Sequence, residues 1–273
     1  MGCHAAESNN TDCDSPKECA ADEIKSDKEF SSNEEASSEI LRICSCVGCK
    51  VGILKKKLLV LDINGLLVDL VYPPPNDQNP DTIIRGVAVF KRPFYLDFLK
   101  FCFERFEVSI WSSRSRRNVE PIVEYLMGEM KNKLLFCWDY SHCTGTSFKT
   151  FEDSHKELQF KDMKKVWDKQ FPNLPWDKGY YNESNTLLLD DSPCKALLNP
   201  PYTTLFPHTF TYKNKSDNSL GAGGDLREYI GELVNVENVP KYVEEHPFGQ
   251  EPITKTSQSW NFYIQIIDSL SAS

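Results

Sequence analysis

One stretch of the chain constrains its fold more than any other. Residues 57–68 read Lys-Leu-Leu-Val-Leu-Asp-Ile-Asn-Gly-Leu-Leu-Val, so an apolar run typical of a buried strand delivers Asp62 to its end, and Gly65 follows. Ligands of a parallel α/β sheet bind at the carboxyl edge of its strands. A carboxylate at that edge can attack a phosphoryl group and form an aspartyl-phosphate. The segment therefore predicts a parallel sheet with a reactive aspartate at its carboxyl edge.

Strand-like and helix-like segments alternate after residue 54, which is the pattern of a parallel, doubly wound sheet. The expected strands are residues 58–62, 107–111, 134–138 and 186–189, with 203–206 as a candidate fifth, and the expected helices are 94–105, 115–130, 162–169 and 226–236. Residues 69–91 are expected to form a flap or hairpin, and residues 139–160 an irregular polar insertion. The predicted fold class is α/β, a Rossmannoid three-layer fold whose central sheet is mostly parallel.

Composition divides the chain into three expected parts. Residues 1–50 hold eleven acidic and five basic residues, six of the ten cysteines and little periodic apolar content, which predicts a disordered acidic arm. Residues 51–240 are expected to form the folded domain. Residues 241–273 form a C-terminal extension, and the sequence leaves open whether it docks on that domain.

Several classes of protein are disfavoured. A net charge of -9 argues against direct nucleic-acid binding, which needs a basic face. The longest apolar runs fall short of the roughly 18 residues of a membrane span, and the acidic first residues resemble neither a secretory signal nor a mitochondrial presequence. Cysteines without a secretory signal fit a reducing compartment. We therefore expect an intracellular monomer of the nucleus or cytoplasm that has no membrane span.

Polar groups of complementary kinds follow three of the expected strands and open one expected helix. In chain order they are Asp62, Ser112, Ser113, Lys161, Asp190 and Asp191. Carboxylates that converge on one edge repel each other without a cation, and oxygen ligands of this kind suit Mg²⁺. A hydroxyl near a helix start and a lysine ammonium both suit a phosphate. Each residue alone is an ordinary cap or turn residue, but together they indicate phosphoryl transfer to an aspartate with Mg²⁺ as cofactor.

The same residues resemble a known family, the FCP/SCP-type (NLI-interacting-factor-like) phosphatase domain of the haloacid dehalogenase superfamily. Residues 59–68 are similar to its first motif, LVLDLDETLV, and residues 91–93 resemble its Arg-Pro-Gly helix start. Residues 111–113, Trp-Ser-Ser, occur in the family's second motif in the same form. Residues 160–163 resemble its Lys-Asp-Leu, and residues 189–193 its Val-Asp-Asn-Ser-Pro.

The resemblance implies a role for each of these positions. Asp62 is the implied nucleophile, and the implied substrates are phosphoproteins, notably phosphoserine in the RNA polymerase II C-terminal repeat. The implied ligands of Mg²⁺ are Asp62, the backbone carbonyl of Asn64, Asp190 and Asp191, and the implied phosphate ligands are Ser112, Ser113 and Lys161.

Asn64 departs from the family motif, which has a second aspartate there. That aspartate protonates the leaving group and then activates water, and an amide can do neither. A positioned general acid or base contributes roughly 10²–10⁴-fold. Two hypotheses follow. The first is a Mg²⁺-dependent Ser/Thr phosphoprotein phosphatase that is slow or recruits another acid such as Asp69. The second is an inactive pseudo-phosphatase that binds a partner, resembling the phosphatase-like subunit of the mitochondrial inner-membrane import translocase. We favour the phosphatase, because an abandoned site has little reason to keep the other groups.

Overall fold

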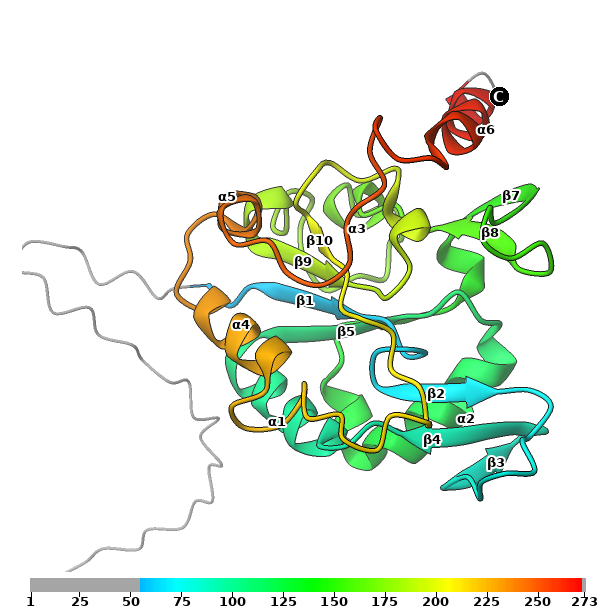
Figure 1. Cartoon of the computed structure of the whole chain (residues 1–273). Coiled ribbons are helices and arrows are strands. Elements are labelled where there is room, and N and C mark those ends of the chain that lie inside the picture. Colours follow the sequence, from blue (N-terminus) through cyan, green and yellow to red (C-terminus); the bar gives the residue numbers. More distant parts are fainter. Residues whose placement is uncertain (1–54, 272–273) are drawn as a thin grey trace, which may run out of the picture. The chain divides into compact units, whose positions relative to one another are not determined.

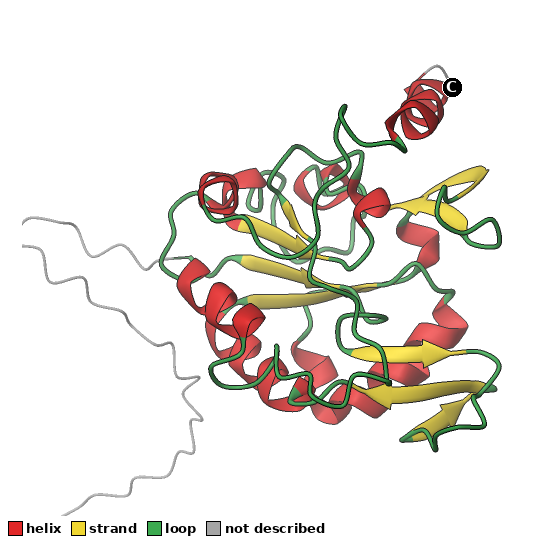
Figure 2. Cartoon of the chain, viewed as in Figure 1, coloured by secondary structure: helices red, strands yellow, loops and turns green. Residues whose placement is uncertain are grey.

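A parallel sheet forms the centre of the computed structural model, which describes residues 55–271. Its strand order is β10-β9-β1-β5-β6, and helices cover both of its sides (Figures 1 and 2). The strands are β1 (Leu58–Leu61), β5 (Glu107–Trp111), β6 (Cys137–Trp138), β9 (Thr186–Leu189) and β10 (Thr204–Leu205). Every pairing between neighbours in this sheet is parallel. The predicted three-layer α/β fold is therefore confirmed, with β1 at its centre.

The apolar run of β1 is explained by what covers its two faces, because successive side chains of a strand point to opposite sides. Leu59 and Leu61 lie in a core cluster to which four helices contribute. Those helices are α1 (Tyr95–Arg105), α2 (Arg116–Met127), α4 (Asp225–Leu233) and α5 (Val239–Glu245). Leu58 and Val60 lie in a second cluster that includes the short helix α3 (Lys164–Trp167). A strand buried on both faces reads as continuous rather than alternating apolar sequence.

The predicted flap is a small antiparallel sheet of order β2-β4-β3. Its strands are β2 (Val68–Val71), β3 (Thr82–Ile84) and β4 (Val87–Lys91). β2 starts only six residues after Asp62, so the flap begins at the carboxyl edge of the main sheet.

Residues 139–160 were expected to be irregular, and this is wrong for residues 144–160, which include two strands. β7 (Thr144–Lys149) and β8 (Glu157–Phe160) pair as an antiparallel hairpin. β7 is mostly solvent-exposed, so it lacks the apolar alternation by which sequence patterns indicate a half-buried strand. The C-terminal helix α6 (Trp260–Ser271) packs against β8 through Tyr263 and Ile266, and the extension therefore docks on the folded part.

Other predicted boundaries shift by a few residues. The helix expected over 115–130 ends at Met127, because Gly128 adopts a positive φ of 49°, and a 3-10 helix, η1 (Gly128–Lys133), follows. The remaining 3-10 helices of the described part are η2 (Tyr140–His142), η3 (Glu183–Asn185) and η4 (Pro193–Ala196). The predicted acidic arm lies outside the described residues. No helix within residues 55–271 is long and apolar enough to cross a membrane.

Arg92, at the end of the flap, forms a buried two-pronged ion pair with Asp217. Its Nε donates to Oδ1 at 2.8 Å and its Nη2 to Oδ2 at 2.9 Å, and its Nη1 donates to the Leu66 carbonyl at 3.1 Å. Arg92→Ala leaves a buried carboxylate without its partner, so we expect the free energy of unfolding to fall by about 3–5 kcal/mol. Chemical denaturation measures this change. The fully exposed Arg116, paired with Glu120, is the control, since Arg116→Ala should leave stability almost unchanged. Equal effects of the two substitutions would refute the argument.

Candidate active site

The carboxyl ends of β1 and β9 bring three predicted carboxylates together. Leu61 and Leu189 are register partners in these parallel neighbours, so the residues that follow them lie side by side. Asp62, Asp190 and Asp191 are all buried, and one carboxylate oxygen of each lies within 4.8 Å of the others. The convergence expected from the strand ends is therefore present.

Lys161 also reaches this cluster, from the end of β8. Its Nζ lies 3.2 Å from Asp62 Oδ1 and 2.5 Å from Asp190 Oδ2, and its side chain is fully buried. Asn199 Nδ2 donates to the Lys161 carbonyl at 2.9 Å. This predicted phosphate ligand thus contacts the carboxylates themselves.

Lys195, on η4, is a site residue that was not predicted from the sequence. Its Nζ lies 2.7 Å from Asp62 Oδ2, 2.9 Å from Asp190 Oδ1 and 3.9 Å from Asp191 Oδ1. The Lys195 carbonyl accepts the backbone N–H of Lys161 at 2.8 Å. Asp191 lies before the start of η4, so no helical repeat relates it to Lys195, and the sequence offered no signal for this contact.

The two ammonium groups determine the charge state of the aspartates. Burial opposes ionisation of Asp62, but the positive charges of Lys161 and Lys195 outweigh it and hold the pKa of this carboxyl well below its usual range. Burial raises the pKa of Asp191, and the neighbouring Asp190 and Asp62 add to that rise. For Lys195, burial is outweighed by the three carboxylates, so its pKa lies well above the ordinary value. Asp62 is therefore ionised, which is the form that a nucleophile requires.

The turn after β1 shows why Gly65 stands beside the aspartates. Gly65 has φ +77°, and a Cβ at this position would lie 1.9 Å from Asp191 Oδ2. Only glycine lets the backbone pass this close to a carboxylate in that conformation. The Asn64 side chain points elsewhere, since its Oδ1 accepts the backbone N–H of Leu70 in the flap at 2.9 Å.

Ser112 and Ser113 follow β5 at the same edge. Ser112 is buried, its backbone N–H donates to the Trp138 carbonyl at 2.9 Å, and its Oγ accepts the Arg114 N–H at 3.3 Å. The N-cap of α2 is Ser115, so both predicted serines lie in the connecting turn rather than directly at the helix start. Arg114 is half-buried and within electrostatic range of Asp62. Burial lowers its pKa, and the Asp62 charge opposes that change.

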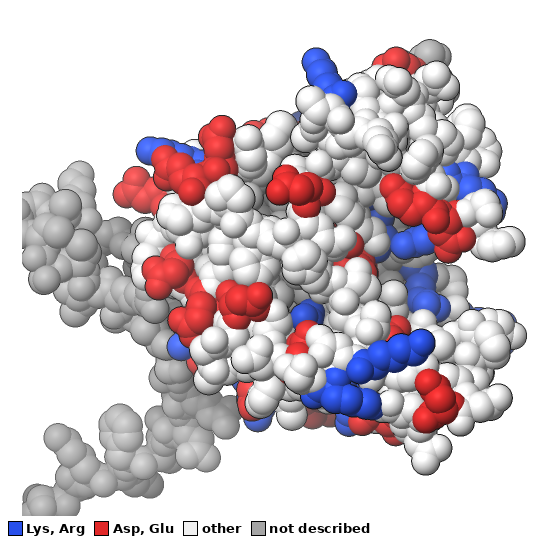
Figure 3. All heavy atoms as spheres, viewed as in Figure 1, with Lys and Arg blue, Asp and Glu red and all other residues white. Residues whose placement is uncertain are grey.

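Access to the cluster is narrow. Asp62 is only 1% exposed, so a ligand reaches its carboxylate only if neighbouring side chains move. Several Lys and Arg side chains gather on the side of the molecule where the strands end, between the flap and the β7–β8 hairpin (Figures 1 and 3). Asp and Glu side chains lie beside them on the same face (Figure 3), so this surface is mixed in charge.

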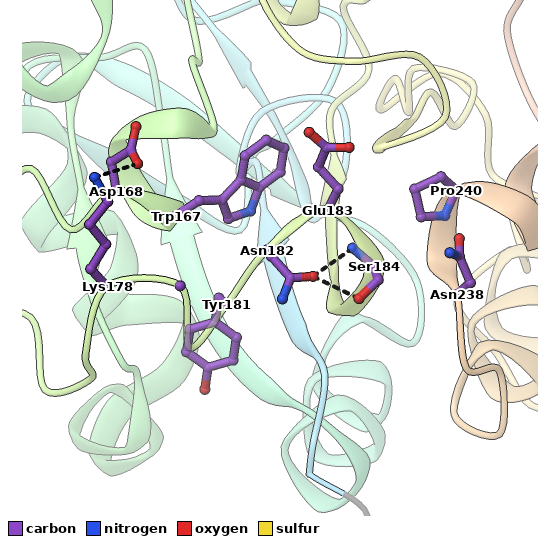
Figure 4. A pocket seen from close by; sticks show the side chains of 10 residues that line it. Trp167, Asp168, Lys178, Tyr181, Asn182, Glu183, Ser184, Asn238 and Pro240 are labelled. Atoms are coloured by element: carbon purple, nitrogen blue, oxygen red, sulfur yellow. Dashed lines mark hydrogen bonds and ion pairs between the residues drawn. The ribbon is translucent and has the colours of Figure 1, made fainter.

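A separate pocket of about 580 Å³ lies away from these residues (Figure 4). Trp167, Tyr181, Glu183 and Asn238 are among its lining residues. Glu183 belongs to η3, which directly precedes β9, whereas Asp190 directly follows that strand. The pocket therefore lies near the amino end of β9, opposite to the carboxylate cluster.

Comparisons with known proteins identify relatives. The family model for NLI interacting factor-like phosphatases matches residues 57–240. An uncharacterized FCP1 homology domain-containing protein of Schizosaccharomyces pombe is 26% identical over 196 residues, covering 71% of this chain and 78% of that protein. A Dictyostelium discoideum protein named "Probable C-terminal domain small phosphatase" is 26% identical over 198 residues, covering 69% of this chain and 54% of that protein.

Among solved structures, the fission yeast RNA polymerase II CTD phosphatase Fcp1 aligns with a TM-score of 0.36 and 13% identity. The alignment covers 80% of this chain and 63% of that one, so the chain spans less than two thirds of Fcp1 and 54% of the Dictyostelium protein. The family model covers more than half of the chain, from the strand that carries Asp62 to the start of α5. The chain therefore belongs to the NLI interacting factor-like phosphatase family, the FCP/SCP-type branch of the haloacid dehalogenase superfamily.

Proposed function

We propose that this chain is a Mg²⁺-dependent phosphatase that removes phosphate from serine or threonine side chains of proteins through an aspartyl-phosphate on Asp62. One observation carries the proposal. An ionised aspartate at the carboxyl edge of the sheet has an ammonium group 2.7 Å from one oxygen and another 3.2 Å from the other. The matching family model is that of phosphatases, and the Dictyostelium relative is named a probable phosphatase, which favours an enzyme over the alternative of a binding module.

The carboxylate oxygens of Asp62, Asp190 and Asp191 are suitable ligands for a divalent cation. Three carboxylates whose oxygens lie within 4.8 Å of one another are the hard oxygen ligands that Mg²⁺ prefers. Asp62, the backbone carbonyl of Asn64 and Asp191 would hold the ion, with Asp190 alongside. When bound, it would screen the repulsion between Asp62 and an incoming phosphate.

In the proposed reaction, the site residues have separate roles. Ser112, Ser113 and Lys161 bind the phosphate oxygens. A carboxylate oxygen of Asp62 attacks phosphorus, the bond between phosphorus and the ester oxygen breaks, and the leaving serine or threonine oxygen takes a proton from solvent. Water next attacks the phosphorus of the aspartyl-phosphate and gives up a proton to solvent, which releases inorganic phosphate and restores the Asp62 carboxylate. Both steps need a proton transfer that Asn64 cannot perform, so both are slowed.

The leaving group provides the test. An aryl phosphate leaves as a stable phenolate without an acid, whereas a serine phosphate leaves as a poor alkoxide. We expect the purified chain with Mg²⁺ to hydrolyse an aryl phosphate, to act much more slowly on a phosphoserine peptide, and to lose activity with EDTA. Absence of aryl phosphate turnover, together with tight phosphopeptide binding, would refute the proposal in favour of the binding module.

A further inference from the structure

The reaction steps proposed above assign no contact with the substrate to Lys195, although its ammonium lies inside the carboxylate cluster. Its ammonium contacts Asp62 Oδ2 and Asp190 Oδ1 and lies 3.9 Å from Asp191 Oδ1. Lys161 approaches the other oxygens of Asp62 and Asp190, and its ion pairs within residues 55–271 are with those two residues. Lys195 is thus the ammonium that connects Asp62 to Asp191, the two side chains that would hold a divalent cation.

We propose that the Lys195 ammonium is an internal competitor for the divalent cation at this site. The inference rests on the proposed phosphatase site. A Mg²⁺ ion held by Asp62 and Asp191 would need lone pairs of the two carboxylates between which the Lys195 ammonium lies, at 2.7 Å and 3.9 Å. Two cations that close together also repel each other strongly in a buried site. The ion therefore binds only after the Lys195 side chain has left Asp62 and Asp191.

The local structure lets the ammonium move while the backbone stays in place. The Lys195 carbonyl is fixed by the Lys161 N–H at 2.8 Å, and the preceding Cys194 packs in one cluster with Tyr263 and Ile266 of α6. The lysine side chain itself is a flexible four-carbon stem with a compact charge at its end. The competition is therefore a side-chain movement, and its cost lowers the affinity of the chain for the ion.

Removing the competing charge tests this inference without any measurement of catalysis. Mn²⁺ binding to the full chain is followed by isothermal titration calorimetry and by the electron paramagnetic resonance signal of free Mn²⁺. Lys195→Met keeps the length of the side chain and removes the charge, and we expect the Kd for Mn²⁺ to fall at least about tenfold. Lys195→Arg keeps the charge and should bind as weakly as the unmodified chain.

Lys156 supplies a matched control, because its Nζ lies 3.5 Å from Ser192 Oγ on the rim of the site. Lys156→Met removes the same charge without freeing a carboxylate, so its effect should stay below about twofold. An unchanged Kd in Lys195→Met, or equal gains in the two Met variants, would overturn the inference. If Lys195→Met does not fold, Lys195→Gln is judged by the same criteria. Tighter Mn²⁺ binding without aryl phosphate turnover would support the competition and refute only the proposed phosphatase.

Discussion

Replacing Asp62 by asparagine is expected to lower aryl phosphate turnover by at least about 10³-fold, because an amide cannot attack phosphorus. The substitution keeps the size of the side chain but removes the charge that pairs with Lys161 and Lys195, so circular dichroism of the variant must first establish that it is folded. Absorbance of the released phenolate measures the rate. The matched control is Asp168→Asn, which removes an aspartate that pairs with Lys178 and lies beside the separate pocket, and this variant should keep full activity. An Asp62→Asn protein with more than a tenth of the normal rate would contradict the assigned role.

Asn64→Asp is expected to raise turnover of a phosphoserine peptide by about 10²–10⁴-fold, because it supplies the missing proton donor and acceptor. An aspartate at this position can still accept the Leu70 N–H that Asn64 Oδ1 accepts now. Steady-state phosphate release measures the gain. The first step with an aryl phosphate, seen as a burst of phenolate, should change little because that leaving group needs no acid.

A serine at the same position separates a carboxylate effect from a simple loss of the amide. Asn64→Ser keeps a polar side chain but offers no group that titrates in the required range, so the peptide should be hydrolysed no faster than by the unmodified chain. If Asn64→Asp also gives no gain, then another residue already provides the acid. In that case the half-buried Asp69, whose pKa is raised by burial against the opposing hydrogen bond from Tyr212 N–H, becomes the residue to substitute.

The carboxylates of the site could be predicted from the sequence because each directly follows a strand. Asp62 and Asp190 come after short apolar runs typical of buried strands, and parallel strands align their carboxyl ends. The turn at Gly65 could also be predicted, because a glycine soon after a strand-like run marks a turn. These signals are local in sequence, so they can be recognised without knowledge of the tertiary structure.

Other features depend on contacts between distant segments and left no such signal. In the sequence, Lys195 is an ordinary turn residue after Ser192-Pro193. Its contact with Asp62 forms only when the chain folds and brings η4 close to the end of β1. The pairing of Arg92 with Asp217 joins residues 125 positions apart. The burial of Asp62 likewise follows from side chains of several elements rather than from the strand pattern.

Trapping the intermediate tests the central claim, that Asp62 carries the phosphoryl group, most directly. Because Asn64 cannot activate water, the aspartyl-phosphate should break down slowly and accumulate. The chain is mixed with an aryl phosphate and Mg²⁺, quenched in acid within the first turnover, digested and analysed by mass spectrometry. We expect one phosphoryl group per chain on the peptide that contains Asp62, and none in Asp62→Asn. A phosphoryl group on another residue, or phenolate release without any phosphorylated chain, would contradict the account.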